Sequence, residues 1–192
     1  CDRRQRQMCI RDSLELSAME YNLMNAMSRE TTMKNYLNQI KDRYDFVVID
    51  CMPSLSMVTL NALSAADSVI IPVQAQYLPE KGVTQLVQTI SRVKKYINPD
   101  IKIDGILLTL VDSRTNLAKS TVEALRENFG NHIKMYRTSI PIGVKAAEAS
   151  SKGKSIYGYE PRSTVSKANT AFTKEVLADG RKKERLHSHE AR

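Results

Sequence analysis

The stretch YDFVVIDCMPSL, residues 44–55, decides the fold class. Its centre, Phe46 to Ile49, is a continuous apolar run that is rich in β-branched residues and too short for a stable helix. A run that is apolar throughout, without alternating polar residues, predicts a strand buried on both faces, as in a parallel sheet. The run ends at Asp50, so an acidic side chain is expected at the carboxyl end of this strand.

Outward from this stretch, strand and helix patterns alternate along the chain. Three further strands are expected at Ser68–Val73, Ile103–Leu110 and, from a weaker pattern, Ile133–Thr138. Apolar side chains at three- and four-residue spacing predict helices that begin at Leu16 and then cover 31–41, 54–65, 80–97, 117–128 and 165–177. This alternation predicts an α/β fold in which helices flank both faces of a parallel sheet.

Composition and charge restrict the class of protein. The 192 residues are 42% apolar and 26% charged, and no apolar run reaches the roughly 18 residues that a membrane span needs. Three cysteines without a CxxC pair indicate neither a disulfide framework nor a zinc site, and predict a reduced, cytoplasmic protein. The formal net charge is +8. Both termini are basic, which leaves the body of the chain only mildly basic.

The two ends of the chain differ from its body. Residues 1–13, CDRRQRQMCIRDS, show neither helical nor strand periodicity and resemble a translated sequencing adapter. We interpret them as a non-native leader, with a disordered basic arm as the alternative. Residues 14–179 are expected to form the folded domain, and residues 180–192 are expected to be a polar, basic tail that frays.

Ligands of open parallel α/β sheets bind at the carboxyl ends of the strands, which makes Asp50 the first candidate site residue. Two interpretations of Asp50 are open. It caps the helix that begins near Ser54, or it is a Walker-B-type aspartate that holds Mg²⁺ through water beside a nucleotide phosphate. The next residue, Cys51, has no histidine within these motifs to act as a base, so we interpret it as a buried structural thiol.

Several motifs in a fixed order resemble the ParA/Soj partitioning ATPases, which are deviant Walker P-loop NTPases. They are residues 44–55, NAL at 61–63, AAD at 65–67, SVIIPV at 68–73, GILLT at 105–109, DSRTNL at 112–117, Ile140-Pro141, Glu148-Ala149 and Gly153-Lys154. The resemblance covers roughly Leu14 to Leu177. It implies that the full-length protein binds ATP with Mg²⁺, forms a homodimer on the nucleotide, and then binds DNA non-specifically at the nucleoid. A ParB-like, centromere-binding partner would stimulate hydrolysis and so release the DNA.

The resemblance also assigns residues by position. Asp50 is implied to be the Walker B aspartate, which holds Mg²⁺ indirectly and is the one catalytic residue assigned. Nucleotide contacts are implied for Pro53, Thr109, Asp112, Ile140 and Pro141. DNA contacts are implied for Lys145, Lys152, Lys154 and Arg162.

Two departures from the family pattern bear on activity. Met52 replaces the first of the two prolines that usually follow the aspartate. More seriously, neither a GKGG-type loop nor GxxxxGK[ST] occurs in the 192 residues, so the backbone N–H cradle for phosphates is missing. We therefore expect this chain to be the C-terminal two-thirds of such an ATPase, without the N-terminal strand and P-loop, and not to hydrolyse ATP by itself.

Alternatives from other functional classes stay open. A MinD-like membrane-cycling ATPase would need an apolar stripe in its terminal helix, but residues 180–192 contain only Leu186 as a large apolar residue, so we expect no membrane partner. A pseudo-ATPase that lacks a P-loop and only binds partners is distinguished by the sequence before Leu14. Arg114 and Asn116 either contact nucleotide or the dimer partner, or belong to a turn in which Thr115 or Asn116 starts the next helix.

Overall fold

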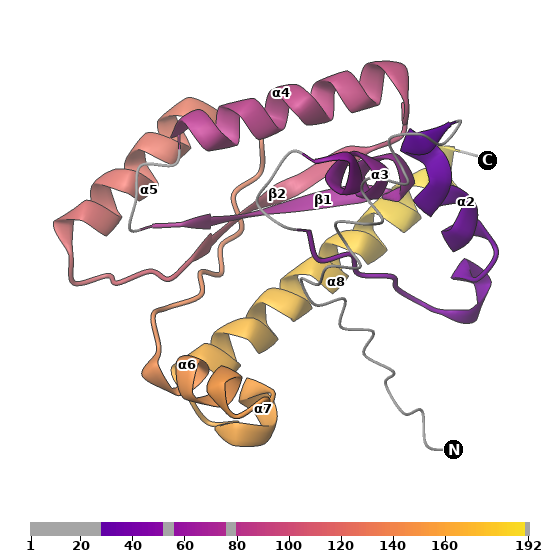
Figure 1. The fold of residues 1–192 in the computed structure, drawn as a ribbon. Helices are drawn as coiled ribbons and strands as arrows, with labels where there is room; N and C mark the ends of the chain where they lie inside the picture. The colour runs from indigo at the N-terminus through magenta and orange to yellow at the C-terminus, as the bar shows by residue number, and fades with distance from the viewer. Residues whose placement is uncertain (1–27, 52–55, 76–79, 191–192) are drawn as a thin grey trace. The chain divides into compact units, whose positions relative to one another are not determined.

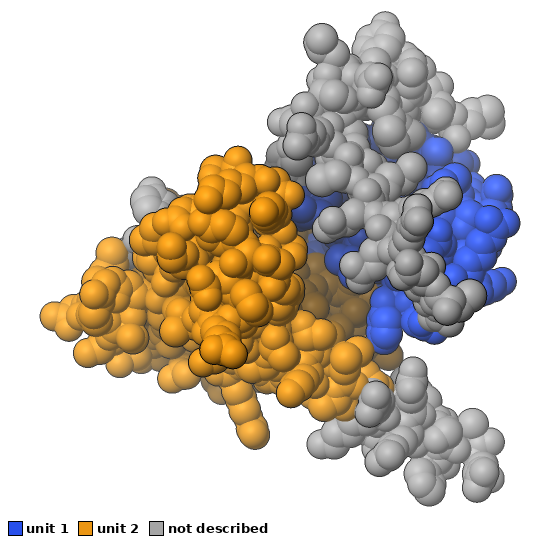
Figure 2. All heavy atoms as spheres, turned by 90° about the horizontal axis from the view of Figure 1, so that it is seen from below, with its two compact units in different colours: residues 1–67, 90–101 blue, residues 68–89, 102–192 orange. Residues whose placement is uncertain are grey.

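The computed structural model describes residues 28–51, 56–75 and 80–190, and it divides into two compact units. Unit 1 contains the described residues up to 67 together with 90–101, and unit 2 contains those of 68–89 and 102–192 (Figure 2). Helix α4 (Glu80–Tyr96) passes from unit 2 into unit 1. Each unit has its own buried apolar side chains, such as Leu63 and Ile101 in unit 1 and Ile71 and Ile106 in unit 2.

Helix α3 (Met57–Ala65) organises unit 1. It begins after Ser56, whose hydroxyl accepts a hydrogen bond from the Thr59 N–H, so that one of the unpaired amides of the first turn has a partner. The 3₁₀ turn η1 (Arg29–Thr31) and helix α2 (Thr32–Asn38) pack on α3, and a second 3₁₀ turn, η2 (Lys41–Arg43), follows α2.

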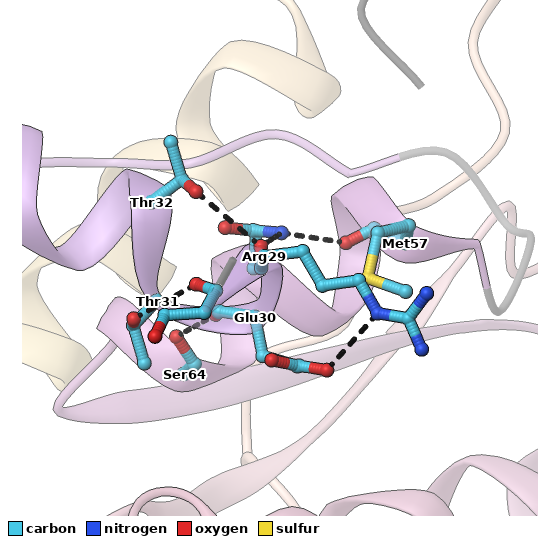
Figure 3. A network of polar contacts seen from close by, with 8 residues as sticks. Arg29, Glu30, Thr31, Thr32, Met57 and Ser64 are labelled. Carbon is cyan, nitrogen blue, oxygen red and sulfur yellow. Dashed lines mark hydrogen bonds and ion pairs between the residues drawn. The ribbon is translucent and has the colours of Figure 1, made fainter. Parts of the chain in front are cut away.

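Asn61 joins these elements from the buried face of α3, where its side chain is 1% exposed. Its Nδ2 donates to the carbonyl oxygens of Arg29 at 2.7 Å and Met57 at 3.1 Å, and its Oδ1 accepts from the Met33 N–H at 3.1 Å. Figure 3 shows this network, with Arg29 and Glu30 beside Met57 and Ser64 of α3. The hydroxyl of Ser64 donates to the Glu30 carbonyl oxygen, so η1 is held on α3 at two points.

The sheet lies in unit 2 and consists of β1 (Ser68–Gln74) and β2 (Lys102–Thr109), which run parallel (Figure 1). The register shifts by one residue after Val69, so that Asp104 forms a bulge, and the Ser68 hydroxyl donates to this carboxylate at 2.6 Å. Along β1, Ile71 and Val73 are buried while the residues between and after them are exposed. β2 carries a longer buried run, from Gly105 to Leu108, as expected for the more central of two strands.

A third, extended segment, residues 133–142, runs beside β2 without forming a continuous strand. Isolated parallel bridges join Ile106 to Met135 and Val111 to Pro141. Gly105 allows this close approach, because a Cβ on this residue would lie 2.7 Å from the Lys134 carbonyl oxygen and 3.0 Å from the Tyr136 ring. The segment expected as a weaker strand at Ile133–Thr138 is therefore extended and bonded to β2, but only at isolated positions.

Four helices complete unit 2: α5 (Asn116–Phe129), α6 (Val144–Ser151), α7 (Ile156–Tyr159) and α8 (Thr164–Glu190). α8 packs on the extended segment through an edge-to-face contact between Phe172 and Tyr136, whose ring centroids lie 5.0 Å apart. The Glu175 carboxylate accepts the N–H groups of Arg137 at 3.0 Å and Thr138 at 3.1 Å. Partial burial opposes the ionised form of Glu175, but these backbone donors outweigh it and lower the pKa of the carboxyl.

Most expected elements are confirmed, and the fold is the predicted α/β class with a parallel sheet and flanking helices. The helix expected from Leu16 lies outside the described residues, as do the 1–13 leader and Pro53. In the segment expected to be a polar, basic tail, the backbone continues α8 to Glu190. Within the described part of the chain, no helix is both long and apolar enough to cross a membrane.

The strand expected at Phe46–Ile49 is wrong for this structure. Residues 46–50 have no regular secondary structure, and the side chains of Phe46 and Val48 are 72% and 90% exposed. A parallel strand forms only beside another backbone that accepts and donates its hydrogen bonds, and none of the described residues pairs with this segment. Cys51, expected to be buried, is consequently exposed.

Candidate functional site

The carboxyl end of β2 and the extended segment beside it form the candidate site in unit 2. Thr109 ends β2, and its hydroxyl donates to the Val73 carbonyl oxygen of β1 at 3.3 Å. The next residue, Leu110, has a left-handed backbone with φ +50°. This conformation is strained for a branched side chain, and such strain is concentrated at functional sites in proteins.

Backbone hydrogen bonds hold Ile140 and Pro141 against this strand end. The Ile140 N–H donates to the Leu108 carbonyl at 2.9 Å, and the Ile140 carbonyl accepts from the Val111 N–H at 3.1 Å. Val111 also accepts from the Ile142 N–H at 3.2 Å and pairs with Pro141. The structure therefore brings together four of the five residues assigned to the nucleotide: Thr109, Asp112, Ile140 and Pro141.

Asp112 is engaged by Arg114 two residues later. The guanidinium donates from Nε to Oδ1 and from Nη2 to Oδ2, both at 2.9 Å, and the Arg114 N–H donates to Oδ1 at 3.1 Å. The turn ends at Thr115, whose hydroxyl accepts from the Ala118 N–H at 3.3 Å and so caps α5. The cap interpretation is confirmed for Thr115. The pairing of Asp112 with Arg114 was not among the expectations from the sequence, although an Asp at the start of a turn is a local signal for bonds to residues two positions on.

The hydrogen bonds from the Arg114 side chain, and then from its backbone N–H, lower the pKa of Asp112 to about 2. We expect ¹³C NMR of the carboxyl carbons to show this pKa, and Arg114→Ala to raise it toward the ordinary value for Asp. Because the folded-state pKa is lowered, the pairing contributes stability above the ordinary pKa and loses it as the pH falls toward 2. Lys119→Ala, which removes another exposed cation, is the control. An Asp112 pKa that is the same with and without Arg114 would contradict the pairing.

Asp50 belongs to unit 1, in the exposed segment without regular structure. Its carboxylate raises the pKa of the neighbouring Cys51 thiol, in addition to the larger effect of partial desolvation. An exposed carboxylate is the donor type that Mg²⁺ accepts through water, so Asp50 fits an indirect magnesium contact. Among the described residues, no three His, Cys, Asp or Glu side chains gather in a way that could hold a metal ion directly.

The four residues assigned to DNA are all exposed and all lie in unit 2. Lys145 is on α6, Lys152 caps the C-terminus of α6, and Lys154 and Arg162 lie in the loops before α7 and α8. Residues 144–163 carry three Lys and one Arg against two Glu, Glu148 and Glu160. The segment therefore has a formal net charge of +2, and in the sequence it follows almost directly on Ile140 and Pro141 of the candidate site.

An α/β domain with a parallel sheet, whose strand ends carry polar residues, belongs to the class of open α/β domains that bind ligands at the carboxyl ends of their strands. The AAA_31 family model, described as an AAA domain, matches residues 3–103. The sporulation initiation inhibitor protein Soj of Bacillus subtilis is 42% identical over 168 residues, and the chromosome partitioning protein ParA of Myxococcus xanthus is 40% identical over 163. The chain belongs to the ParA/Soj-type partitioning ATPases of the MinD/ParA superfamily.

These relatives are longer than this chain. The matches cover 88% and 85% of the chain, but 66% of Soj and 57% of the Myxococcus ParA. Among solved structures, the Mycobacterium smegmatis cobyrinic acid a,c-diamide synthase with bound ADP and magnesium is 36% identical, with a TM-score of 0.63 over 67% of this chain and 52% of that one. The Cyanthece apo McdA is 15% identical, with a TM-score of 0.72 over 84% of this chain and 65% of that one, which shows the shared fold.

Proposed function

We propose that the protein is a nucleotide-dependent DNA-binding switch for chromosome or plasmid partitioning. It binds ATP with Mg²⁺, dimerises, and in that state holds duplex DNA without sequence preference at the nucleoid. A ParB-like partner stimulates hydrolysis and so ends DNA binding. The observation that carries the proposal is that the candidate nucleotide site and the exposed, basic segment 144–163 lie in the same compact unit and are neighbours in the sequence.

In this proposal, Mg-ATP supplies the phosphoryl group that passes to water. Thr109 offers a hydroxyl, and Ile140 and Pro141 offer an apolar wall, which together suit the base of a nucleotide. By the family resemblance, Asp50 would hold Mg²⁺ indirectly, through the water shell of the ion. Asp112 orients the turn after β2, because both of its carboxylate oxygens are occupied by Arg114. The phosphate cradle is assigned to none of the 192 residues, since the glycine-rich lysine loop is absent from them.

Non-specific DNA binding requires only cations that reach phosphates, with no element that reads base edges. Lys154 and Arg162 meet this requirement, since both are exposed and flank the short helix α7. In the same segment, Lys145 lies on α6 and Lys152 caps the C-terminus of that helix.

The test is fluorescence anisotropy of the full-length protein with an arbitrary 30-base-pair duplex in Mg-ATP, titrated at several salt concentrations. With four cations engaged, the logarithm of the binding constant should fall with the logarithm of salt at a slope of about −3.6, a loss of about 150-fold between 50 and 200 mM. Lys154→Ala and Arg162→Ala should each reduce the slope by about 0.9. Mg-ADP should support weaker binding than Mg-ATP.

Lys119→Ala, an exposed lysine on α5, is the matched control and should leave the slope unchanged. Absence of DNA binding in Mg-ATP, or binding that does not respond to salt, would refute the proposed function. An equal loss of slope in the Lys119 variant would show that net charge, and not segment 144–163, determines the affinity.

A further inference from the structure

A polar cluster joins α6 to α7 inside the basic segment. We call it the Glu148 cluster; it consists of Lys145, Glu148, Lys152 and Tyr159. The Oε2 atom of Glu148 accepts from Lys145 Nζ at 3.0 Å and from the Tyr159 hydroxyl at 2.9 Å. Lys152 Nζ in turn donates to the Tyr159 hydroxyl at 3.1 Å and lies 4.8 Å from the centroid of its ring.

The backbone holds the cluster in this arrangement. α6 ends in a turn in which Gly153 has φ +62°, a left-handed conformation that favours glycine, and the Lys154 N–H returns to the Ala149 carbonyl oxygen at 3.0 Å. Ser155 then caps α7 by accepting from the Gly158 N–H. The buried Ser166 of α8 donates to the Glu160 carbonyl oxygen at 2.8 Å, which fixes the end of α7. Tyr159 is thereby placed over α6 with its hydroxyl between the carboxylate and Lys152.

The cluster changes the charge that segment 144–163 presents to an anion. The hydrogen bond from Lys145, and then that from Tyr159, lower the pKa of Glu148, so the carboxylate is ionised near neutral pH. Lys145 has a carboxylate partner, and Lys152 is linked to the same carboxylate through Tyr159. A phosphate that approaches Lys145 has to compete with an anion that already occupies the ammonium group.

We propose that Glu148 is an internal competitor of DNA phosphates and sets the affinity of the basic segment. This inference rests on the DNA binding proposed above. The carboxylate keeps Lys145 and Lys152 ordered in the absence of DNA, and it weakens their contact with phosphate when DNA arrives. Lys154 and Arg162 are outside the cluster and engage phosphate without this competition. The result is DNA binding that stays readily reversible.

The test is Glu148→Gln in the anisotropy experiment, because glutamine keeps the shape and the hydrogen-bond acceptor but removes the charge. Affinity should rise about threefold, the size of effect expected for an exposed ion pair, and the salt dependence should become steeper. The gain should nearly vanish when Lys145→Ala is also present, since the competition then has no target. Glu148→Asp, which keeps the charge, should bind like the wild type.

Glu123→Gln on the exposed side of α5 changes the net charge by the same amount and is the matched control. An equal gain in the control, or an unchanged or weaker affinity of Glu148→Gln, overturns the inference while the DNA-binding function stands. Failure of the wild type to bind DNA overturns both. Thermal unfolding shows whether each variant folds. If Glu148→Gln does not fold, Tyr159→Phe tests the same inference, because it removes the link between Glu148 and Lys152 and should also raise the affinity for DNA. No gain in affinity in the Tyr159 variant would overturn the inference.

Discussion

Replacing Asn61 by leucine should lower the free energy of unfolding by about 2–4 kcal/mol. Leucine fills a similar volume but can neither donate nor accept, so the Met33 N–H and the Arg29 carbonyl oxygen each lose their bond to Asn61 in a buried place. The cost of an unsatisfied buried polar group exceeds the small net gain of a typical hydrogen bond, which is why the effect is large. Urea denaturation followed by circular dichroism measures the loss.

Asn35→Leu is the matched control, because Asn35 is exposed on α2 and the chemical change is the same. Its effect should stay within about 0.5 kcal/mol. Hydrogen exchange adds a local measurement: the amides of residues 29–38 should lose protection in the Asn61 variant, since η1 and α2 are held on α3 by these bonds. Equal stability of the two variants would show that Asn61 does not join the elements of unit 1.

The elements predicted correctly are those that local pattern alone determines. α4 and α5 show regular three- and four-residue spacing of apolar residues over 17 and 14 residues, long enough for an unambiguous helical period. β1 and β2 are β-branched runs bounded by polar or turn residues. By contrast, α6 and α7 have 8 and 4 residues and few large apolar side chains, so no apolar periodicity predicted these helices.

The segment Phe46–Ile49 shows the limit of such patterns. Its composition predicts a strand as well as that of β1 does, yet only β1 has a partner among the described residues. A strand is a property of a pair of backbones, whereas a helix satisfies its own hydrogen bonds. Local sequence therefore identifies a helix more securely than it identifies which strands are paired.

The candidate site was predictable in part, and for a topological reason. Parallel strands place their carboxyl ends at one edge of the sheet, so Thr109 and the Ile140-Pro141 pair were expected near one another once β2 and the weaker strand pattern at 133–138 were recognised. Of the side-chain bonds, that of Asp112 with Arg114 had a local turn signal in the sequence, whereas that of Tyr159 with Glu148 depends on how α6 and α7 pack, which no periodicity encodes. These contacts change which charged groups are accessible to a ligand.

Ile106→Ala should lower the free energy of unfolding by about 2–5 kcal/mol. Ile106 is 0% exposed in the middle of β2, opposite Ile71 of β1 and bridged to Met135 of the extended segment. The truncation removes buried apolar atoms and leaves a cavity. The cavity cannot easily collapse, because β2 is held in place by β1 on one side and by the extended segment on the other. Urea denaturation gives the overall loss, and Ile106→Val should cost about 0.5–1.5 kcal/mol.

Ile142→Ala removes the same atoms from a side chain that is 40% exposed and should cost much less. A further consequence follows from the hydrogen bonds that flank Ile106. Its N–H donates to the Lys134 carbonyl at 2.8 Å and its carbonyl accepts from the Tyr136 N–H at 3.0 Å, so the cavity lies where the extended segment is aligned. The bonded amides of Tyr136 and Ile140 should therefore exchange faster in Ile106→Ala. Unchanged exchange there would mean that alignment of the extended segment at Ile140 and Pro141 depends on Glu175 and α8 rather than on the packing of Ile106.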